Sequence, residues 1–241
     1  MGTTSLWAMV LAMGVYQGLN PPMGWLLGVA RGLERRSGAA VLGATFSVAA
    51  GHYLAMAAVL LPAALALALS GLPPMAAQPW LGGALLGFGL FKLCRRAHPR
   101  ALARIRPGHT VRWSFLMALA HCGSPLMMLS PLVSVLVLLR LQGHGGADPL
   151  TRAGWFAAAA LTVPGAMIAA LLLTASLAAL LVHRALGLAA LTRFWIDLDL
   201  GWALAFLAMG GMALAMGAAG GAMPGLPAWA MVLARTLCRT G

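Results

Sequence analysis

This sequence is poor in charge, and above all in acidic residues. Of its 241 residues only 8% are charged, and four Asp and Glu stand against sixteen Lys and Arg. Soluble domains carry roughly 25% charged residues, so the composition excludes an ordinary soluble domain. Since 61% of the residues are hydrophobic and fall in long runs, the sequence predicts an all-α integral membrane protein.

Cysteine is scarce as well. The three cysteines, Cys94, Cys122 and Cys238, are odd in number and form no C-x-x-C pair. A structural disulfide framework is therefore not expected, and we interpret Cys94 and Cys238 as small apolar helix residues. The chain also lacks an ATP-binding loop. We expect neither direct ATP coupling nor another enzymatic activity in it.

Six apolar runs approach or exceed the ~20 residues that a membrane-spanning helix needs. They cover residues 5–30, 38–66, 76–93, 113–139, 154–182 and 195–217. A tryptophan stands near the start of five of them, where an interfacial aromatic belt would place it: Trp7, Trp80, Trp113, Trp155 and Trp195. Small residues, among them Gly82, Gly83, Gly87, Gly89, Gly210 and Gly211, predict close approach of helices.

The net charge of +12 comes from arginines in short loops between the apolar runs. This pattern is typical of topology determinants rather than of nucleic-acid binding, so no nucleic-acid partner is expected. The loops that follow the first, third and fifth runs are the basic ones, and they should face the cytoplasm. Segment 140–152 offers only Arg140 and Arg152 against Asp148 and should lie outside.

Two of the runs are interrupted by proline. The first break reads GLNPPM at residues 18–23, and the second reads HCGSPLMM at residues 121–128. Proline cannot donate a backbone hydrogen bond, so each site should break a helix at membrane depth. Free backbone groups there are tolerated only where protein or a polar cavity satisfies them. Paired breaks in corresponding places of two halves indicate a transport site.

Each break opens a group of three runs. Because three is an odd number, two similar halves must insert with opposite orientations, which is a common transporter plan. We therefore predict two inverted three-helix repeats with broken first helices, at residues 1–95 and 113–217. A basic cytoplasmic linker, 96–112, would join them, and residues 218–241 would form a C-terminal tail that is too short to span.

Few polar side chains fall at membrane depth, and each is a candidate site residue by default. His52 lies near the middle of the second run, and Asp197 stands at the start of the sixth. The other substrate-binding candidates come from the two breaks: Asn20, Pro21, Pro22, Met23, His121, Cys122, Ser124 and Pro125.

A transition metal is one substrate that these residues could take. Imidazole suits transition metals, and Cys and Met suit soft ones. The candidate metal ligands are His52, His121, Cys122 and Met127. The alternative interpretation is apolar packing by Met and a hydrogen bond from His to a carbonyl freed by the break. No resident cofactor is expected; the metal would be the transported ion.

The order of these features resembles the lysine-exporter (LysE) superfamily, which includes amino-acid exporters, metal exporters and membrane thiol-disulfide transporters. GLNPP at 18–22 is similar to the exporters' Pro-Gly-Pro break and to the thiol transporters' Ser-Pro-Cys break. GLERRSG at 32–38 resembles the exporters' basic first loop, and Gly43 and Gly51-His52 continue that spacing. Residues 81–93 resemble the third span, and HCGSP at 121–125 the second break.

These patterns together predict a multi-pass secondary transporter of the bacterial inner membrane. It would move a small solute, either an amino-acid-like molecule or a transition metal ion, through a site between the two broken helices. The alternatives are a membrane thiol carrier that uses Cys122 and an accessory subunit of a larger membrane complex. The expected partners are the lipid bilayer and the solute, and a homo-oligomer is compatible with the sequence.

Overall fold

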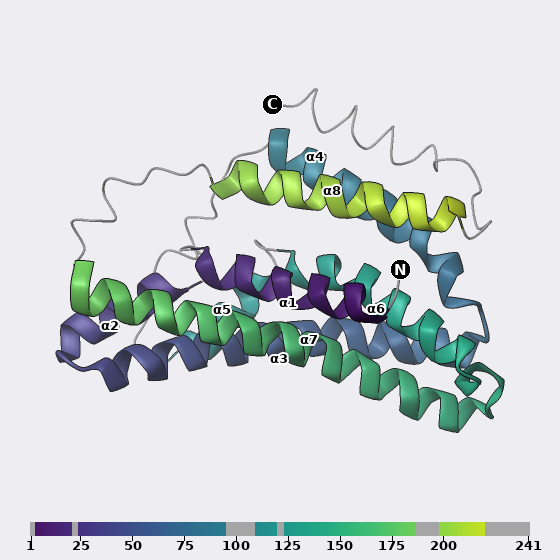
Figure 1. Ribbon diagram of the computed structural model, residues 1–241, viewed down its shortest axis with the longest axis horizontal. Helices are drawn as coiled ribbons and strands as arrows, with labels where there is room; N and C mark the ends of the chain where they lie inside the picture. Colours follow the sequence, from purple (N-terminus) through teal and green to yellow (C-terminus); the bar gives the residue numbers. More distant parts are fainter. Residues whose placement is uncertain (1–2, 21–23, 95–108, 120–122, 187–197, 220–241) are drawn as a thin grey trace. The chain divides into compact units, whose positions relative to one another are not determined.

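A computed structural model describes residues 3–20, 24–94, 109–119, 123–186 and 198–219. These residues form helices and turns, and no strand occurs among them (Figure 1). The helices are α1 (Thr3–Leu19), α2 (Trp25–Arg35), α3 (Gly38–Ser70), η2 (Pro74–Ala77), α4 (Gln78–Cys94), α5 (Thr110–Met117), α6 (Ser124–Leu141), η5 (His144–Gly146), α7 (Pro149–Leu181), the π-helical turn η6 (Val182–Leu186) and α8 (Leu198–Ala219).

Three of the described helices are long and apolar enough to cross a membrane. They are Gly38–Ser70, Ser124–Leu141 and Pro149–Ala185, and a shorter apolar stretch covers Ala203–Ala218. The prediction of a helical membrane protein is confirmed at this level. The predicted first and third runs correspond to the pair α1 and α2 and to the 17-residue α4.

The chain divides into two compact units that each draw on separate stretches of sequence. Unit 1 comprises residues 1–57, 99–122 and 162–198, and unit 2 comprises residues 58–98, 123–161 and 199–241. The long helices α3 and α7 each contribute one part to each unit. This grouping follows spatial contact and does not test the predicted repeats, which stay a prediction.

In unit 1 glycines let α1 approach α7 closely and let α2 approach α3. Gly14 and Gly18 of α1 lie against the α7 backbone at Met167 and Leu171. The spacing Gly14-x-x-x-Gly18 is the small-residue motif of close helix pairs in membranes. Gly28 of α2 lies against Thr45 of α3.

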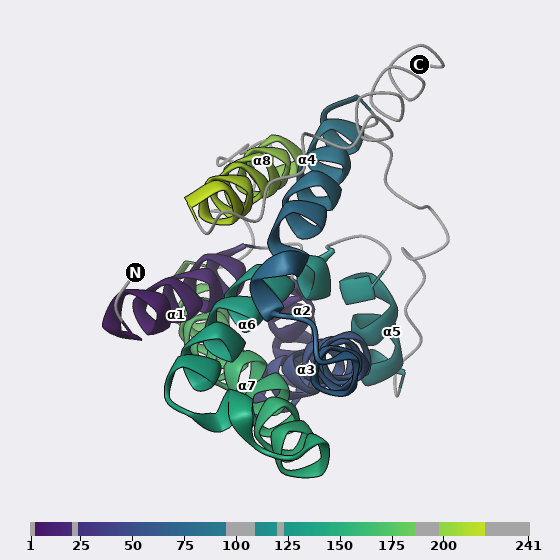
Figure 2. The same ribbon diagram turned by 90° about the vertical axis from the view of Figure 1, so that its right-hand side faces the viewer.

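Unit 2 packs α4 beside α8, and the two ribbons lie side by side in both views (Figure 1 and Figure 2). Cβ atoms on Gly82 and Gly89 would meet Leu214 and Leu207 of α8, and one on Gly210 would meet Leu86 of α4. The predicted role in helix packing is thus confirmed for these glycines. It is wrong for Gly211, which is exposed and whose Cβ would meet no described atom within 4 Å.

Polar side chains at the ends of the long helices satisfy free backbone groups in unit 2. Arg140 donates to the carbonyl of Leu72 at 3.1 Å, and Arg152 donates to the carbonyl of Ala68 at 2.8 Å. The Asp148 carboxylate accepts hydrogen bonds from the backbone N–H groups of Leu150 and Thr151. Asp148 therefore caps the N-terminus of α7.

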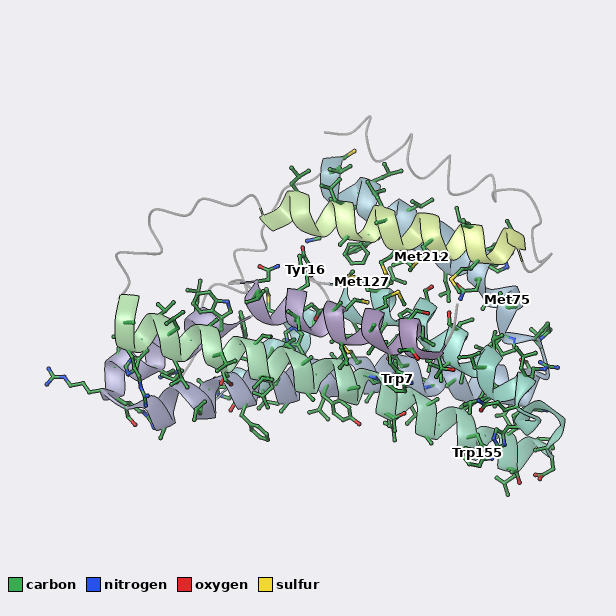
Figure 3. All side chains as sticks on the ribbon, in the orientation of Figure 1. Trp7, Tyr16, Met75, Met127, Trp155 and Met212 are labelled. Carbon is green, nitrogen blue, oxygen red and sulfur yellow. The ribbon has the colours of Figure 1, made fainter. Side chains whose placement is uncertain are left out.

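An exposed tryptophan stands at the start of α7. Trp155 is 44% exposed and lies near the N-terminal end of that helix (Figure 3). Its ring stacks on His144, with centroids 4.3 Å apart. Trp80 in the first turn of α4 is 53% exposed. Both positions suit the interfacial anchors that the sequence predicts.

Candidate functional site

The first predicted break separates α1 from α2. Helix α1 ends at Leu19 and α2 begins at Trp25, after Gly24 with a φ of 113°. The Trp25 indole N–H reaches back and donates to the Leu19 carbonyl at 3.1 Å. This bond satisfies one of the carbonyls that the end of α1 leaves free. A broken helix with a side-chain cap is thus present where the sequence predicts one.

Two amide side chains at the end of α1 are buried without hydrogen bonds. Gln17 is 0% exposed and Asn20 is 4% exposed, and none of their four side-chain polar atoms has a hydrogen-bond partner among the described residues. Gln17 belongs to the buried stripe of α1 together with Val10 and Gly14. An unsatisfied buried polar group costs roughly 1–3 kcal/mol. Two such amides beside a helix break therefore indicate a place where a ligand or water completes the hydrogen bonds.

The buried amide of Gln78 in unit 2 provides the contrast. Its Nε2 donates to the Ser130 carbonyl at 3.3 Å and to Ser134 Oγ at 3.4 Å, and its Oε1 accepts from Ser130 Oγ at 3.2 Å. A buried amide that serves only the fold is satisfied at both ends in this chain. The amides of Gln17 and Asn20 lack such partners among the described residues.

His52 lies in the interior of α3 and is 1% exposed. Its Nδ1 is 2.6 Å from Ser114 Oγ of α5 and 3.3 Å from the Val48 carbonyl. Ser114 Oγ donates to that same carbonyl at 2.6 Å. The serine hydroxyl has one hydrogen, so the imidazole must supply the second one from Nδ1.

This hydrogen count fixes the tautomer of His52. With the proton on Nδ1, Nε2 carries a lone pair. Nε2 is buried, and no described residue is its hydrogen-bond partner. The side chain thus offers one unsatisfied acceptor in the core of unit 1.

The break and His52 are linked through one turn of α3. A Cβ on Gly24 would lie 2.5 Å from Val48 Cγ1, and the Val48 carbonyl is the acceptor that His52 and Ser114 share. The start of α2 therefore rests directly on the turn that positions His52. The predicted candidates Asn20 and His52 both belong to this buried core, while Pro21, Pro22 and Met23 lie outside the described residues.

The second break is described from Gly123 onward. Helix α6 begins at Ser124 after Gly123, which has a φ of 60°. Ser124, Pro125 and Met127 are buried in the first turn, and the Ser124 hydroxyl has no hydrogen-bond partner in the part of the chain that the structure describes. Met127 can be followed on α6 in Figure 3. The other predicted residues, His121, Cys122 and Asp197, lie outside the described part of the chain.

A metal centre is not present among the described residues, since no three His, Cys, Asp or Glu side chains there lie close enough to share an ion. Two of the predicted ligands, His121 and Cys122, fall outside this part of the chain, so the metal hypothesis stays a prediction.

Cys94 at the end of α4 is disulfide-bonded. The interpretation of this residue as a plain apolar side chain is therefore wrong. An odd number of cysteines argues against a framework of several bridges, but it leaves room for one.

Comparisons of the chain with protein-family models, with curated proteins and with solved structures found no match.

Sequence reasoning did not identify Gln17, Gly24 and Ser114. Gln17 had a readable signal, because it is a lone amide three residues before Asn20 on an apolar run. Ser114 had none: its role depends on α5 packing against Gly51 of α3, which is a long-range contact.

Proposed function

We propose that this chain is a secondary transporter that moves a small polar solute through the core of unit 1, beside the break between α1 and α2. The observation that carries the proposal is the pair of buried, unpartnered amides of Gln17 and Asn20. Polar groups buried at membrane depth mark substrate pathways. Broken helices supply further free backbone groups in transport sites.

The chemistry of these groups favours an amino-acid-like solute over a metal ion. Two amides offer both N–H donors and carbonyl acceptors, which match the carboxylate and the ammonium group of an amino acid. The unpartnered Nε2 of His52 adds one more acceptor. A soft metal would instead need the thiolate of Cys122, as well as His52 and His121.

The order of elements supports the predicted architecture of six spans in two inverted repeats. A broken pair, α1 and α2, is followed by the 33-residue α3 and by α4. A second pair, α5 and α6, is followed by the 33-residue α7 and by α8. In each pair the second half-helix follows a glycine with positive φ, Gly24 or Gly123. The proposed location is the inner membrane of a bacterial-type cell, with several passes.

The test is transport by the purified chain in lipid vesicles, with a panel of amino acids and transition metals. We expect Gln17→Leu and Asn20→Leu to lower uptake of the cognate solute by about tenfold or more, which corresponds to roughly 1.4 kcal/mol of lost binding. The matched control is Gln142→Leu, the same exchange at an exposed residue that follows α6. Wild-type uptake by both site variants would overturn the proposal.

A thiol carrier is the second candidate, and the disulfide at Cys94 is the observation that favours it. Cys122→Ser separates the candidates, because an amino-acid-like solute bound by amides does not need the thiol. Normal amino-acid transport by this variant would exclude both the thiol carrier and a metal-thiolate site. Loss of metal transport, with His52→Ala impaired in parallel, would favour the metal ion as solute.

A further inference from the structure

Unit 1 contains a basic cavity where α2, α3 and α5 meet. Its volume is about 500 Å³, and its lining includes two guanidinium groups, hydroxyl groups and small residues: Arg31, Arg35, Ser37, Gly43, Ala44 and Ser47 among them. All of its lining residues belong to unit 1. The cavity includes none of Gln17, Asn20 or His52, so it is separate from the proposed transport site.

The charge in this cavity is positive and only partly neutralised. Arg31, whose side chain is 16% exposed, pairs with Glu34 at 3.0 Å, while the Glu34 side chain is 62% exposed. Within the described part of the chain, the Arg35 side chain makes no hydrogen bond or ion pair, and none of the residues that line the cavity is acidic. A cavity with an unneutralised guanidinium group attracts anions, and guanidinium geometry matches phosphate oxygens well.

The remaining polar groups at the basic end are donors as well. None of the residues that the structure describes is a hydrogen-bond partner of the Ser37 hydroxyl. Ala39 and Ala40 line the cavity in the first turn of α3, where backbone N–H groups have no intrahelical acceptor. These donors reinforce the preference for an anion that the two arginines create.

The other end of the cavity is mainly apolar and runs along a membrane-spanning helix, and the Ser47 hydroxyl there already donates to the Gly43 carbonyl at 2.8 Å. Its α3 lining extends from Ala39 to Ser47, which is about 12 Å along the helix axis. Gly43 has nothing within 4 Å of the place where its Cβ would stand. The adjacent Leu42 and Phe46 are 45% and 63% exposed. A free phosphate ion would occupy only the basic end, whereas a phospholipid would fill both ends.

We propose that this cavity binds an anionic phospholipid, with the headgroup phosphate at Arg31 and Arg35 and the start of an acyl chain along Ala40, Gly43 and Ala44. The expected topology places the loop between α2 and α3 in the cytoplasmic leaflet, where basic pockets of membrane proteins recognise anionic headgroups. The lipid site does not involve the transported solute, so its test can fail while the transport proposal holds, and the reverse.

The first test measures lipid retained by the purified full chain, by native mass spectrometry in detergent with phosphatidylglycerol or phosphatidylcholine added. We expect wild type to retain phosphatidylglycerol in preference. Arg35→Gln should weaken that binding roughly fivefold, the effect of one basic residue near an anionic lipid. Arg36→Gln is the matched control, because Arg36 is the exposed neighbour and does not line the cavity.

The second test separates the lipid from a soluble anion. Gly43→Leu fills the apolar end without a change in charge, and we expect it to weaken phosphatidylglycerol binding while inorganic phosphate fails to displace the lipid from wild type. Equal binding of both lipids by wild type would overturn the proposal. An equal loss of phosphatidylglycerol binding by Arg35→Gln and Arg36→Gln would overturn it as well. Full displacement by phosphate together with normal binding by Gly43→Leu would show a soluble-anion site instead.

Discussion

At the scale of single residues, the two buried glutamines of this chain differ in their hydrogen bonding. Gln78 of unit 2 has hydrogen-bond partners for its amide, whereas Gln17 of unit 1 has none. Removing a satisfied group leaves its partners unpaired, while removing an unsatisfied one relieves a penalty.

The exchange to leucine should therefore separate the two residues in stability. Gln78→Leu should lower the free energy of unfolding by roughly 1–2 kcal/mol, since Ser130 loses its acceptor in an apolar setting. Gln17→Leu should leave it unchanged or raise it. Denaturant unfolding in micelles checks this, and a larger loss from Gln17→Leu than from Gln78→Leu would show that Gln17 has structural partners.

The tautomer of His52 is a second prediction at this scale. We expect the neutral ring to carry its proton on Nδ1, because Ser114 Oγ already donates to the Val48 carbonyl. Nitrogen-15 spectra of labelled His52 distinguish a protonated Nδ1 from a protonated Nε2. Ser114→Ala removes the acceptor and should mix the tautomers. Detection of the Nε2-protonated form in wild type would contradict the hydrogen count.

At the scale of elements, the half-helices α2 and α6 both depend on a glycine that precedes them. Gly24 and Gly123 have positive φ, and a Cβ on Gly123 would lie 2.7 Å from the Phe206 ring. A left-handed backbone costs an L residue about 1–2 kcal/mol. Gly24→Ala and Gly123→Ala should therefore each lower stability by at least that amount.

The control for these variants is Gly211→Ala in α8, where the space is open. Alanine there should raise stability by up to ~1 kcal/mol, because it favours the helix interior. Thermal unfolding of the three variants in parallel checks both expectations. Similar midpoints for Gly24→Ala and Gly211→Ala would contradict the left-handed start of α2.

The N-terminal end of α7 should depend on pH through Asp148. Hydrogen bonds from the Thr151 side chain and backbone lower the pKa of this carboxyl group. The folded pKa then lies below the unfolded value of about 3.9, so the stabilisation is complete above that value and is lost as pH falls through the folded pKa. The stability difference between wild type and Asp148→Asn should shrink below pH ~4. A difference that persists under more acidic conditions would mean that the charge is not responsible.

At the scale of the whole molecule, the expected topology has a simple test. Reporter fusions at Ala101, in the basic linker, and at Gly145, after α6, should report opposite sides of the membrane. Arg140 and Arg152, the two arginines of the predicted external segment, donate to the carbonyl of Leu72, just after α3, and to that of Ala68 in its last turn, so they have a structural role there. Location of both fusions on one side would contradict the inverted repeats.

The sequence alone predicted the features that local chemistry determines. Asn-Pro-Pro near residue 20 predicts the end of α1, and the long apolar runs predict α3 and α7. Of the candidate site, the sequence predicted Asn20 and His52. It could not predict Ser114 as the partner of His52, because this contact joins residues 62 positions apart. The disulfide at Cys94 likewise depends on folding that no spacing rule describes.

The matched glycines at residues 24 and 123 also have a consequence in terms of chirality. A D-amino acid favours the positive φ that an L residue avoids. Synthetic D-alanine at either position would therefore keep the backbone and add a methyl group in a different direction. If D-alanine restores the stability that L-alanine lowers, then each half-helix needs a residue that adopts positive φ at its start. If D-alanine and L-alanine lower stability equally, glycine is needed because Val48 and Phe206 leave no room for a methyl group.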